Sequence, residues 1–265
     1  MKYLAMTLLT VMAIAPTADA DIVTKSIPYR YGHTQLEGFL AYDNSVKGKK
    51  PGVLLVHEWW GLNDYVKARA KQIAKLGYVA FALDMYGKGK VTTHPEQAKE
   101  WAQQVNNNRE IWQQRARAGL KILQDYPEVD QARTAAIGYC FGGSSVQILA
   151  YSGADVKGVV SFHGSLIPPP EESAKPIKAK LLILHGAADP LVTRDAMMKY
   201  IDDMEHSGLD WQMIIFGGAK HAFTNPEADK AGMPAVGYNK EADRRSWEYM
   251  KIFLQELFGP ASKDL

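Results

Sequence analysis

Short apolar segments recur along the chain and alternate with segments of helical periodicity. Two early segments, 24–31 and 35–42, alternate polar and apolar residues around the turn-forming Gly32 and predict a pair of strands. Six later segments are rich in Val, Ile and Leu without polar alternation, which is typical of parallel strands covered on both faces. They are 52–57, 78–83, 134–138, 156–162, 180–185 and 211–216.

Apolar residues at helical spacing predict helices between these strands. We expect one from the capping residue Asp64 to Gly77, one over 112–123, one from Thr193 to Gly208, and one from about Lys240 to Gly259. Alternating strands and helices predict an α/β fold, with a doubly wound, mostly parallel sheet of about eight strands flanked by helices. Reactive groups in such folds lie at the carboxyl ends of the strands.

The composition supports one domain that needs no disulfide or metal to hold its core. The 265 residues are 46% hydrophobic and 23% charged, which is enough apolar material for one large core. A net charge of +2 gives no reason to expect nucleic acid or an anionic membrane as a partner. With one cysteine, the chain cannot form an internal disulfide.

The first twenty residues have the pattern of a secretory signal peptide. Lys2 is followed by the apolar run 3–15 and then by Ala18-Asp19-Ala20, which predicts cleavage after Ala20. We therefore expect export, to a bacterial periplasm, of one domain over 21–265 that has no membrane attachment after cleavage. The other interpretation of the same run is a buried N-terminal helix.

The segment 137–143 carries the most specific chemical signal. It reads Ile-Gly-Tyr-Cys-Phe-Gly-Gly, a Gly-x-Cys-x-Gly pentapeptide that follows an apolar run and precedes a small-residue helix start. This is the context of a nucleophile elbow, in which a tight strand-to-helix turn exposes one reactive side chain. Cys140, the only cysteine, stands at its tip. A helix beginning at Phe141 would place partial positive charge beside the sulfur.

An acid and a histidine follow Cys140 in the chain order that α/β hydrolases use. Asp189 comes after the buried strand 180–185, and the alternative for it is an ordinary turn residue before Pro190. His221 follows the next strand in a loop of small residues, and the alternative for it is a solvated surface histidine. His185 precedes the acid, and we interpret it as structural.

These motifs resemble the dienelactone hydrolase family, which is a cysteine branch of the α/β hydrolases. Carboxymethylenebutenolidase is another name for the family's enzyme. The likeness extends from about Ile27 to Phe258. It rests on five motifs in order: Val-Leu-Leu-Val-His-Glu-Trp-Trp-Gly at 53–61, Leu-Asp-Met-Tyr-Gly at 83–87, the elbow at Cys140, His-Gly-Ala-Ala-Asp at 185–189, and Lys-His-Ala-Phe-Thr-Asn-Pro at 220–226.

The resemblance implies roles for further residues near the nucleophile. Glu58 occupies the site of the family's glutamate that accepts the thiol proton when substrate arrives, although it could instead only brace its loop. Holding the sulfur as a thiol until then protects it from oxidation. The backbone N–H groups of Trp59 and Phe141 are expected to hold the oxyanion.

Candidate substrate-binding residues surround these groups in the sequence. Five aromatic or cationic residues are candidates to line the pocket, and each could instead belong to the core or to a solvated loop. They are Trp60, Tyr86, Lys88, Tyr139 and Phe223. Well-known family members bind the substrate carboxylate with two arginines, where this chain has Lys88 and Asn225. Lysine is a point charge and asparagine is uncharged, so a small dianionic dienelactone is not favoured as the substrate.

The sequence thus predicts an exported hydrolase that cleaves an ester or lactone through a cysteine thioester. We expect a small-molecule substrate, no cofactor or metal, and a monomer or small homo-oligomer. Two other classes stay open. One is a non-catalytic binding protein on the same scaffold, which would be indifferent to His221. The other is a redox thiol protein, for which the chain offers no resolving cysteine.

Overall fold

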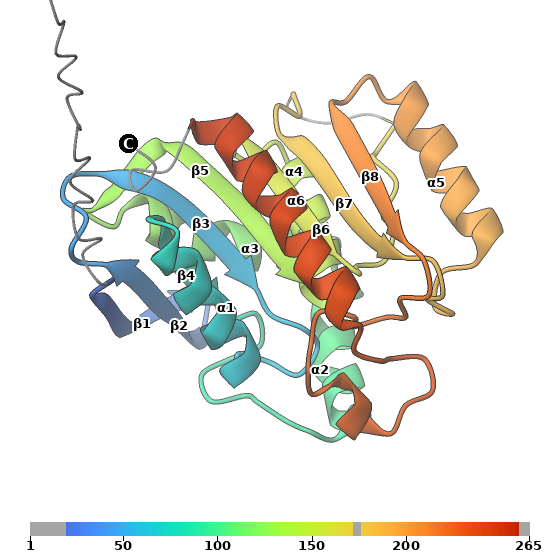
Figure 1. The fold of residues 1–265 in the computed structure, drawn as a ribbon. Helices are drawn as coiled ribbons and strands as arrows, with labels where there is room; N and C mark the ends of the chain where they lie inside the picture. The colour runs from blue at the N-terminus through green and yellow to red at the C-terminus, as the bar shows by residue number, and fades with distance from the viewer. Residues whose placement is uncertain (1–19, 172–175, 260–265) are drawn as a thin grey trace, which may run out of the picture.

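The computed structural model describes residues 20–171 and 176–259 and places eight strands in one sheet (Figure 1). They are β1 (Ile22–Tyr31), β2 (Thr34–Asp43), β3 (Lys50–Val56), β4 (Val79–Leu83), β5 (Val129–Tyr139), β6 (Gly158–Phe162), β7 (Lys180–Gly186) and β8 (Trp211–Phe216). Their order across the sheet is β1-β2-β4-β3-β5-β6-β7-β8. Strand β2 pairs antiparallel with β1 and β4, and all other pairs are parallel. The predicted sheet is confirmed.

Helices cover both faces of this sheet. On one face lie α1 (Asp64–Lys75) and α6 (Lys240–Phe258), in front of the sheet in Figure 1. On the other lie α3 (Arg109–Gln124), α4 (Phe141–Tyr151) and α5 (Arg194–His206), with α2 (Pro95–Asn106) packed on α3. A short 3₁₀ helix, η1 (Ala228–Ala231), lies in the connection between β8 and α6.

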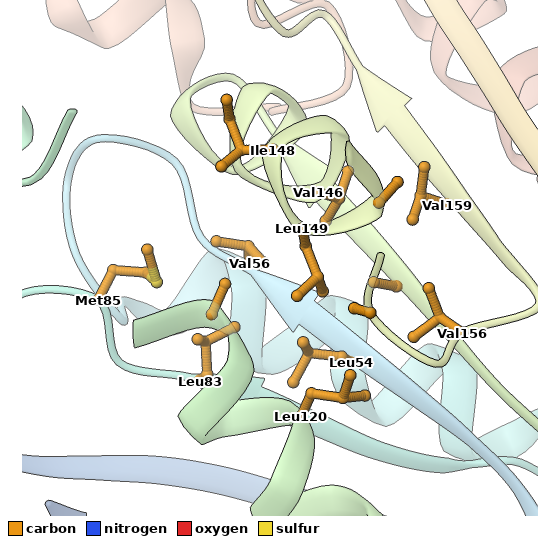
Figure 2. Close-up of a cluster of buried hydrophobic side chains, with 14 of the residues drawn as sticks. Leu54, Val56, Leu83, Met85, Leu120, Val146, Ile148, Leu149, Val156 and Val159 are labelled. Atoms are coloured by element: carbon orange, nitrogen blue, oxygen red, sulfur yellow. The ribbon is translucent and has the colours of Figure 1, made fainter. Parts of the chain in front are cut away.

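Strand β3 shows why the parallel strands carry no polar alternation. Leu54 and Val56 belong to the cluster beneath α3 and α4, whereas Val53 and Leu55 belong to the cluster beneath α1 and α6. All four are fully buried, because successive side chains of a strand point to opposite faces and both faces are covered. Figure 2 shows the first cluster, in which Leu54 lies beside Leu120 of α3.

Helix α1 begins one residue earlier than the sequence indicates. Asn63, not Asp64, is its N-cap, and the Asn63 side chain accepts a hydrogen bond from the Val66 N–H. Asp64 then lies in the first turn, where its negative charge faces the positive end of the helix. Asparagine and aspartate are about equally good caps, so the two adjacent residues could not be separated by type.

Two further elements differ from the prediction. Strand β5 begins at Val129 rather than Thr134, because its first residues pair with Lys50 and Pro51 before the register shifts at Gly52. Helix α2 is not predicted at all. It starts with Pro95 at the first helical position and buries mainly small residues, so its apolar periodicity is weak.

The predicted leader lies outside the described residues, except for Ala20 at its end. Across 20–171 and 176–259, the structure contains no helix that is both long enough and apolar enough to cross a bilayer.

Candidate active site

Cys140 occupies a turn between β5 and α4 that few residues can adopt. It has φ 54° and ψ −117°, and α4 begins at the next residue. Positive φ is strained for a residue with a side chain and is found where the surrounding structure enforces it. The Cys140 N–H donates to Phe162 O at 3.0 Å and to His163 Nδ1 at 3.1 Å, which ties the turn to the end of β6. The cysteine side chain is half-buried.

Three glycines permit the close crossing around this turn. A Cβ atom on Gly138 would lie 1.9 Å from Gly142 O, and one on Gly142 would lie 2.2 Å from Val56 O. A Cβ on Gly143 would lie 2.7 Å from Ser161 Oγ. The first turn of α4 therefore packs directly against the carboxyl ends of β3 and β6.

Asp189 and His221 meet at the same edge of the sheet. His221 Nδ1 lies 2.8 Å from Asp189 Oδ2, and the Cys140 side chain is close enough to His221 to raise the pKa of the imidazole. Burial alone would lower the pKa of His221, but Cys140 and Asp189 outweigh it and raise that pKa to about 10. The contacts thus run from sulfur to imidazole to carboxylate. The catalytic roles of the three residues remain predictions at this point.

Asp189 is held by more than the histidine. Its Oδ1 accepts a hydrogen bond from Leu191 N–H at 2.9 Å. Burial would raise the pKa of Asp189, but the bonds from His221 and Leu191 reverse this and lower it. The carboxylate is therefore ionised and fixed, so the His221 ring nitrogen that faces it carries the proton.

A second histidine, His163, links the cysteine turn to the loop of His221. Its Nδ1 accepts the Cys140 N–H, so the neutral ring carries its proton on Nε2 and donates to Thr224 Oγ1 at 2.7 Å. Burial, and then the charges of His221 and Arg69, hold the pKa of His163 well below its usual range, so the ring is neutral. The sequence places His163 at a strand end but assigns it no role.

Arg69 of α1 anchors the segment that follows His221. One guanidinium nitrogen donates to Thr224 O at 2.6 Å and to the Asp243 carboxylate at 2.5 Å, and Nε donates to Tyr65 OH at 3.3 Å. The Tyr65 hydroxyl is in turn 2.6 Å from Thr224 Oγ1. The sequence does not predict this anchor, because an arginine on a helix usually lies on a solvated face.

The loop after β3 is braced by His57 and carries Glu58. His57 Nδ1 donates to Glu58 O at 2.5 Å, and its Nε2 accepts the Met85 N–H at 3.2 Å. These two bonds use both ring nitrogens and fix the loop against the end of β4. His57 is therefore structural.

Glu58 is a buried carboxyl group whose direct partner is neutral. Its Oε2 accepts a hydrogen bond from Asn225 Nδ2 at 2.7 Å, and its side chain is almost fully buried. Burial raises the pKa of Glu58 to about 7, although Asn225, His221 and Arg69 each favour the ionised form. The carboxyl group therefore changes its charge near neutral pH.

A cavity of about 430 Å³ opens above Cys140. Glu58, Cys140 and His221 lie together in its wall. The remaining wall residues come from the loops after β3, β4, β7 and β8: Trp59, Trp60, Asn63, Thr92, Thr93, Leu191, Ala222, Asn225, Glu227, Ala228, Lys230, Ala231, Met233 and Val236.

Of the five predicted substrate-binding residues, the structure places one in this wall, Trp60. Tyr139 is fully buried and stacks on Phe162, because it directly precedes Cys140 and points to the opposite face of β5. Phe223 is fully buried against the His163 ring, and Tyr86 packs against Phe141.

Lys88 also lies away from the cavity wall. Its ammonium group is 3.1 Å from Glu37 Oε1 at a partly exposed site. A contact between Lys88 and substrate is therefore not supported, and the solvated-loop interpretation describes it better.

The two amides predicted to hold an oxyanion come from adjoining segments. Phe141 is the first residue of α4, whose opening N–H groups have no partner within the helix. Trp59 follows Glu58 in the loop after β3, and a Cβ on Gly142 would lie 2.8 Å from the His57 carbonyl oxygen of that loop. The oxyanion role of the two amides remains a prediction.

No group of three or more His, Cys, Asp or Glu side chains arranged to hold a metal ion is found within residues 20–171 and 176–259.

Comparison with known proteins identifies a family. The model of the dienelactone hydrolase family matches residues 36–258. A solved structure of a dienelactone hydrolase-like promiscuous phosphotriesterase from metagenomic libraries is similar, with 38% identity and a TM-score of 0.86 over 90% of this chain and 99% of that chain. The solved structure named m3DLH has 40% identity and a TM-score of 0.85 over 89% of this chain and 99% of its own.

A curated relative is similar over most of both chains. It is a protein of Saccharolobus solfataricus that carries the name "Putative carboxymethylenebutenolidase". The two are 26% identical over 88% of this chain and 98% of the relative.

The buried Glu58 predicts a pH-dependent cost to stability. Because its pKa of about 7 in the fold exceeds the ordinary value of 4.5, the ionised form is disfavoured in the folded state. The free energy of unfolding of the wild type, relative to Glu58→Gln, should fall as the pH rises from 4.5 through about 7, by up to about 3 kcal/mol. Urea unfolding of both proteins across this range measures the difference.

The exposed Glu205 of α5 provides the matched control, since Glu205→Gln removes a carboxyl group without changing the core. A Glu58→Gln difference that stayed constant with pH would show that the Glu58 carboxyl is not perturbed by the fold.

Proposed function

This chain belongs to the dienelactone hydrolase family and is a hydrolase, and we propose that it cleaves a carboxylic ester or lactone with Cys140 as the nucleophile. The observation that carries the proposal is that Cys140 and His221 share the wall of a cavity and interact there, with the Asp189 carboxylate 2.8 Å from His221 Nδ1. The printed name of the Saccharolobus relative, a carboxymethylenebutenolidase, supports a lactone or ester as the substrate.

In the first half of the reaction, the Cys140 sulfur attacks the substrate carbonyl carbon. The thiol proton passes to a base, the carbonyl π electrons move to oxygen, and the amides of Phe141 and Trp59 stabilise the resulting oxyanion. The tetrahedral intermediate collapses to a thioester, and the His221 imidazolium gives its proton to the departing alkoxide oxygen. Asp189 holds the ring in the orientation that both transfers need.

In the second half, water hydrolyses the thioester. His221 takes a proton from the water as its oxygen attacks the thioester carbonyl, and the same amides hold the second oxyanion. Collapse of this intermediate releases the carboxylic acid and returns the sulfur as the thiolate. The proton held by Glu58 then returns to the sulfur, and His221 is again the imidazolium with which the cycle began. In a lactone, the alcohol and the acid leave as parts of one molecule.

We assign Glu58 as the acceptor of the thiol proton. The carboxyl group lies in the cavity wall with Cys140, and its pKa of about 7 allows it to bind and release a proton near neutral pH. The competing interpretation is that Glu58 only braces its loop. The bonds of His57 weaken that interpretation, because they already fix the loop without the Glu58 side chain.

The contacts of His221 argue against a binding protein, and the cysteine count argues against a redox thiol protein. A binding protein has no need of a histidine held between a carboxylate and a sulfur. A redox thiol protein that forms disulfides needs a second cysteine, and the sequence has only a single cysteine, Cys140.

Replacing the proposed nucleophile gives the direct test. Cys140→Ala should lower kcat/KM for aryl esters and lactones by at least about 10⁴-fold, because the thioester can no longer form. A panel of para-nitrophenyl esters and lactones with the purified mature protein measures this. Cys140→Ser should retain the fold but remain far weaker than the wild type. Hydrolysis by Cys140→Ala at the wild-type rate would contradict the assignment.

The role of Glu58 can be separated from bracing by the pH dependence of the reaction. If Glu58 accepts the proton, wild-type kcat/KM should rise with pH through about 7, as the carboxylate forms. Glu58→Gln should lose this rise and be slower by about 100-fold. A bracing role predicts instead that Glu58→Gln keeps the wild-type pH profile at a reduced rate.

We also propose that residues 1–20 are removed during export to a periplasm. Strand β1 starts at Ile22, two residues after the proposed cleavage site. The Asp21 N–H lies 3.1 Å from the buried Asp43 Oδ1. Cleavage after Ala20 would convert that N–H into an ammonium group beside the carboxylate, which would strengthen the contact.

Expression of the whole chain in a Gram-negative bacterium tests the proposal. The periplasmic fraction should contain protein that begins at Asp21, measured by intact mass and N-terminal sequencing. Ala18→Gln should block cleavage, because the site requires small residues. Recovery of the wild type in the cytoplasm with residues 1–20 still attached would refute export.

A further inference from the structure

The cavity wall is mostly apolar. The loop after β3 contributes the rings of Trp59 and Trp60, whose centroids are 4.8 Å apart at an interplanar angle of 59°. The loop after β7 contributes Leu191, which is 62% exposed at the rim. The connection after β8 contributes further apolar side chains: Ala228, Ala231, Met233 and Val236.

This last connection is fixed in position above the cavity. His221 and Val236 form an isolated β-bridge, and the Gly237 N–H donates to His221 O at 3.0 Å. The apolar side chains of the connection therefore have a defined place relative to the imidazole. Substrate groups that reach beyond the reacting carbonyl must pack against them.

Among the described residues of the wall, each cationic group lies beside a carboxylate. Lys230 is the one lysine or arginine among the wall residues of the described chain, and its ammonium group is paired with the Glu227 carboxylate. When His221 is positive, the Asp189 carboxylate 2.8 Å from its Nδ1 balances the charge. Glu58 contributes a second carboxyl group, and its partner Asn225 is a neutral amide.

A carboxylate on the substrate would therefore lose water without gaining a cation. Moving an ionised group from water into an apolar cavity is unfavourable unless it is paired there. The carboxylates of Glu58 and Glu227 would also repel it. An uncharged aryl or branched alkyl group meets neither penalty, and it gains from burial against Trp59, Trp60 and Leu191.

We propose that this cavity selects uncharged esters or lactones with an aryl or branched alkyl group, and discriminates against substrates that carry a carboxylate. This inference rests on the proposed hydrolase function. It adds the chemical class of the substrate, which follows from the charges and the apolar surface of the wall.

Two isosteric substrates test the proposal. One is the mono-para-nitrophenyl ester of adipic acid, and the other is its analogue in which an isopropyl group replaces the free carboxyl group. Both release the same phenol, so the reaction at the carbonyl is matched. Wild-type kcat/KM should be at least about tenfold higher for the uncharged ester, as expected for unpaired charge in a cavity of low polarity.

A change of charge at the rim then tests the cause. Leu191→Lys should raise kcat/KM for the anionic ester several-fold, because it supplies the missing cation. The ratio of kcat/KM for the uncharged ester to that for the anionic ester should therefore fall. Leu191→Met, of similar length and without charge, is the control and should keep the wild-type ratio. The backbone bond from Leu191 N–H to Asp189 is available to both variants.

The outcomes separate the two proposals. Equal or faster hydrolysis of the anionic ester by the wild type, with both activities abolished by Cys140→Ala, would overturn the inference on substrate class and leave the hydrolase function intact. If Leu191→Lys and Leu191→Met changed the ratio of kcat/KM for the two esters equally, the electrostatic cause would be overturned. Failure to hydrolyse either ester would overturn the hydrolase function, and the inference with it.

Discussion

The close crossing of β5 and α4 is the constraint on which the rest of the site depends. Gly138 and Gly142 lie so near each other that a Cβ on Gly138 would be 1.9 Å from Gly142 O. The chain can turn this sharply only if one residue takes a positive φ, and that residue is Cys140, at 54°. The same crossing presses the first turn of α4 against the end of β3. One local packing requirement thus places the sulfur, the helix N-terminus and the loop of Glu58 at a single point.

The sequence predicted the fold well because buried parallel strands have a simple signature. Val53 to Val56 are all apolar since both faces of β3 are covered, and a rule about strand ends then located Cys140, Asp189 and His221 at one edge of the sheet. The errors arose where that rule says nothing about side-chain direction. Tyr139 is adjacent to Cys140 in the sequence, yet the alternation along a strand turns it into the core.

The supporting contacts of the site could not be predicted, because their partners are far apart in the chain. Arg69 and Thr224 are separated by 155 positions, and His163 and Thr224 by 61. Neither a strand pattern nor a helix pattern specifies which arginine turns inward or which threonine accepts its bond. The function of these contacts is positional: through Thr224 they connect the Cys140 turn to the loop that carries His221.

Asn225 connects the acidity of Glu58 to the charge that the cavity accepts. A cation at this position would stabilise the Glu58 carboxylate and lower its pKa, and it would also attract anionic substrates. The Asn225 amide favours the ionised form of Glu58 through one hydrogen bond, but it carries no charge, so it neither outweighs burial nor attracts an anion. It satisfies one carboxyl oxygen with a 2.7 Å hydrogen bond, and burial still raises the pKa to about 7. The uncharged side chain of Asn225 therefore has two consequences. The Glu58 carboxyl group binds protons near neutral pH, and the described residues of the wall offer no free cation at this position. A proton acceptor of this strength and a preference for neutral substrates belong together in this site.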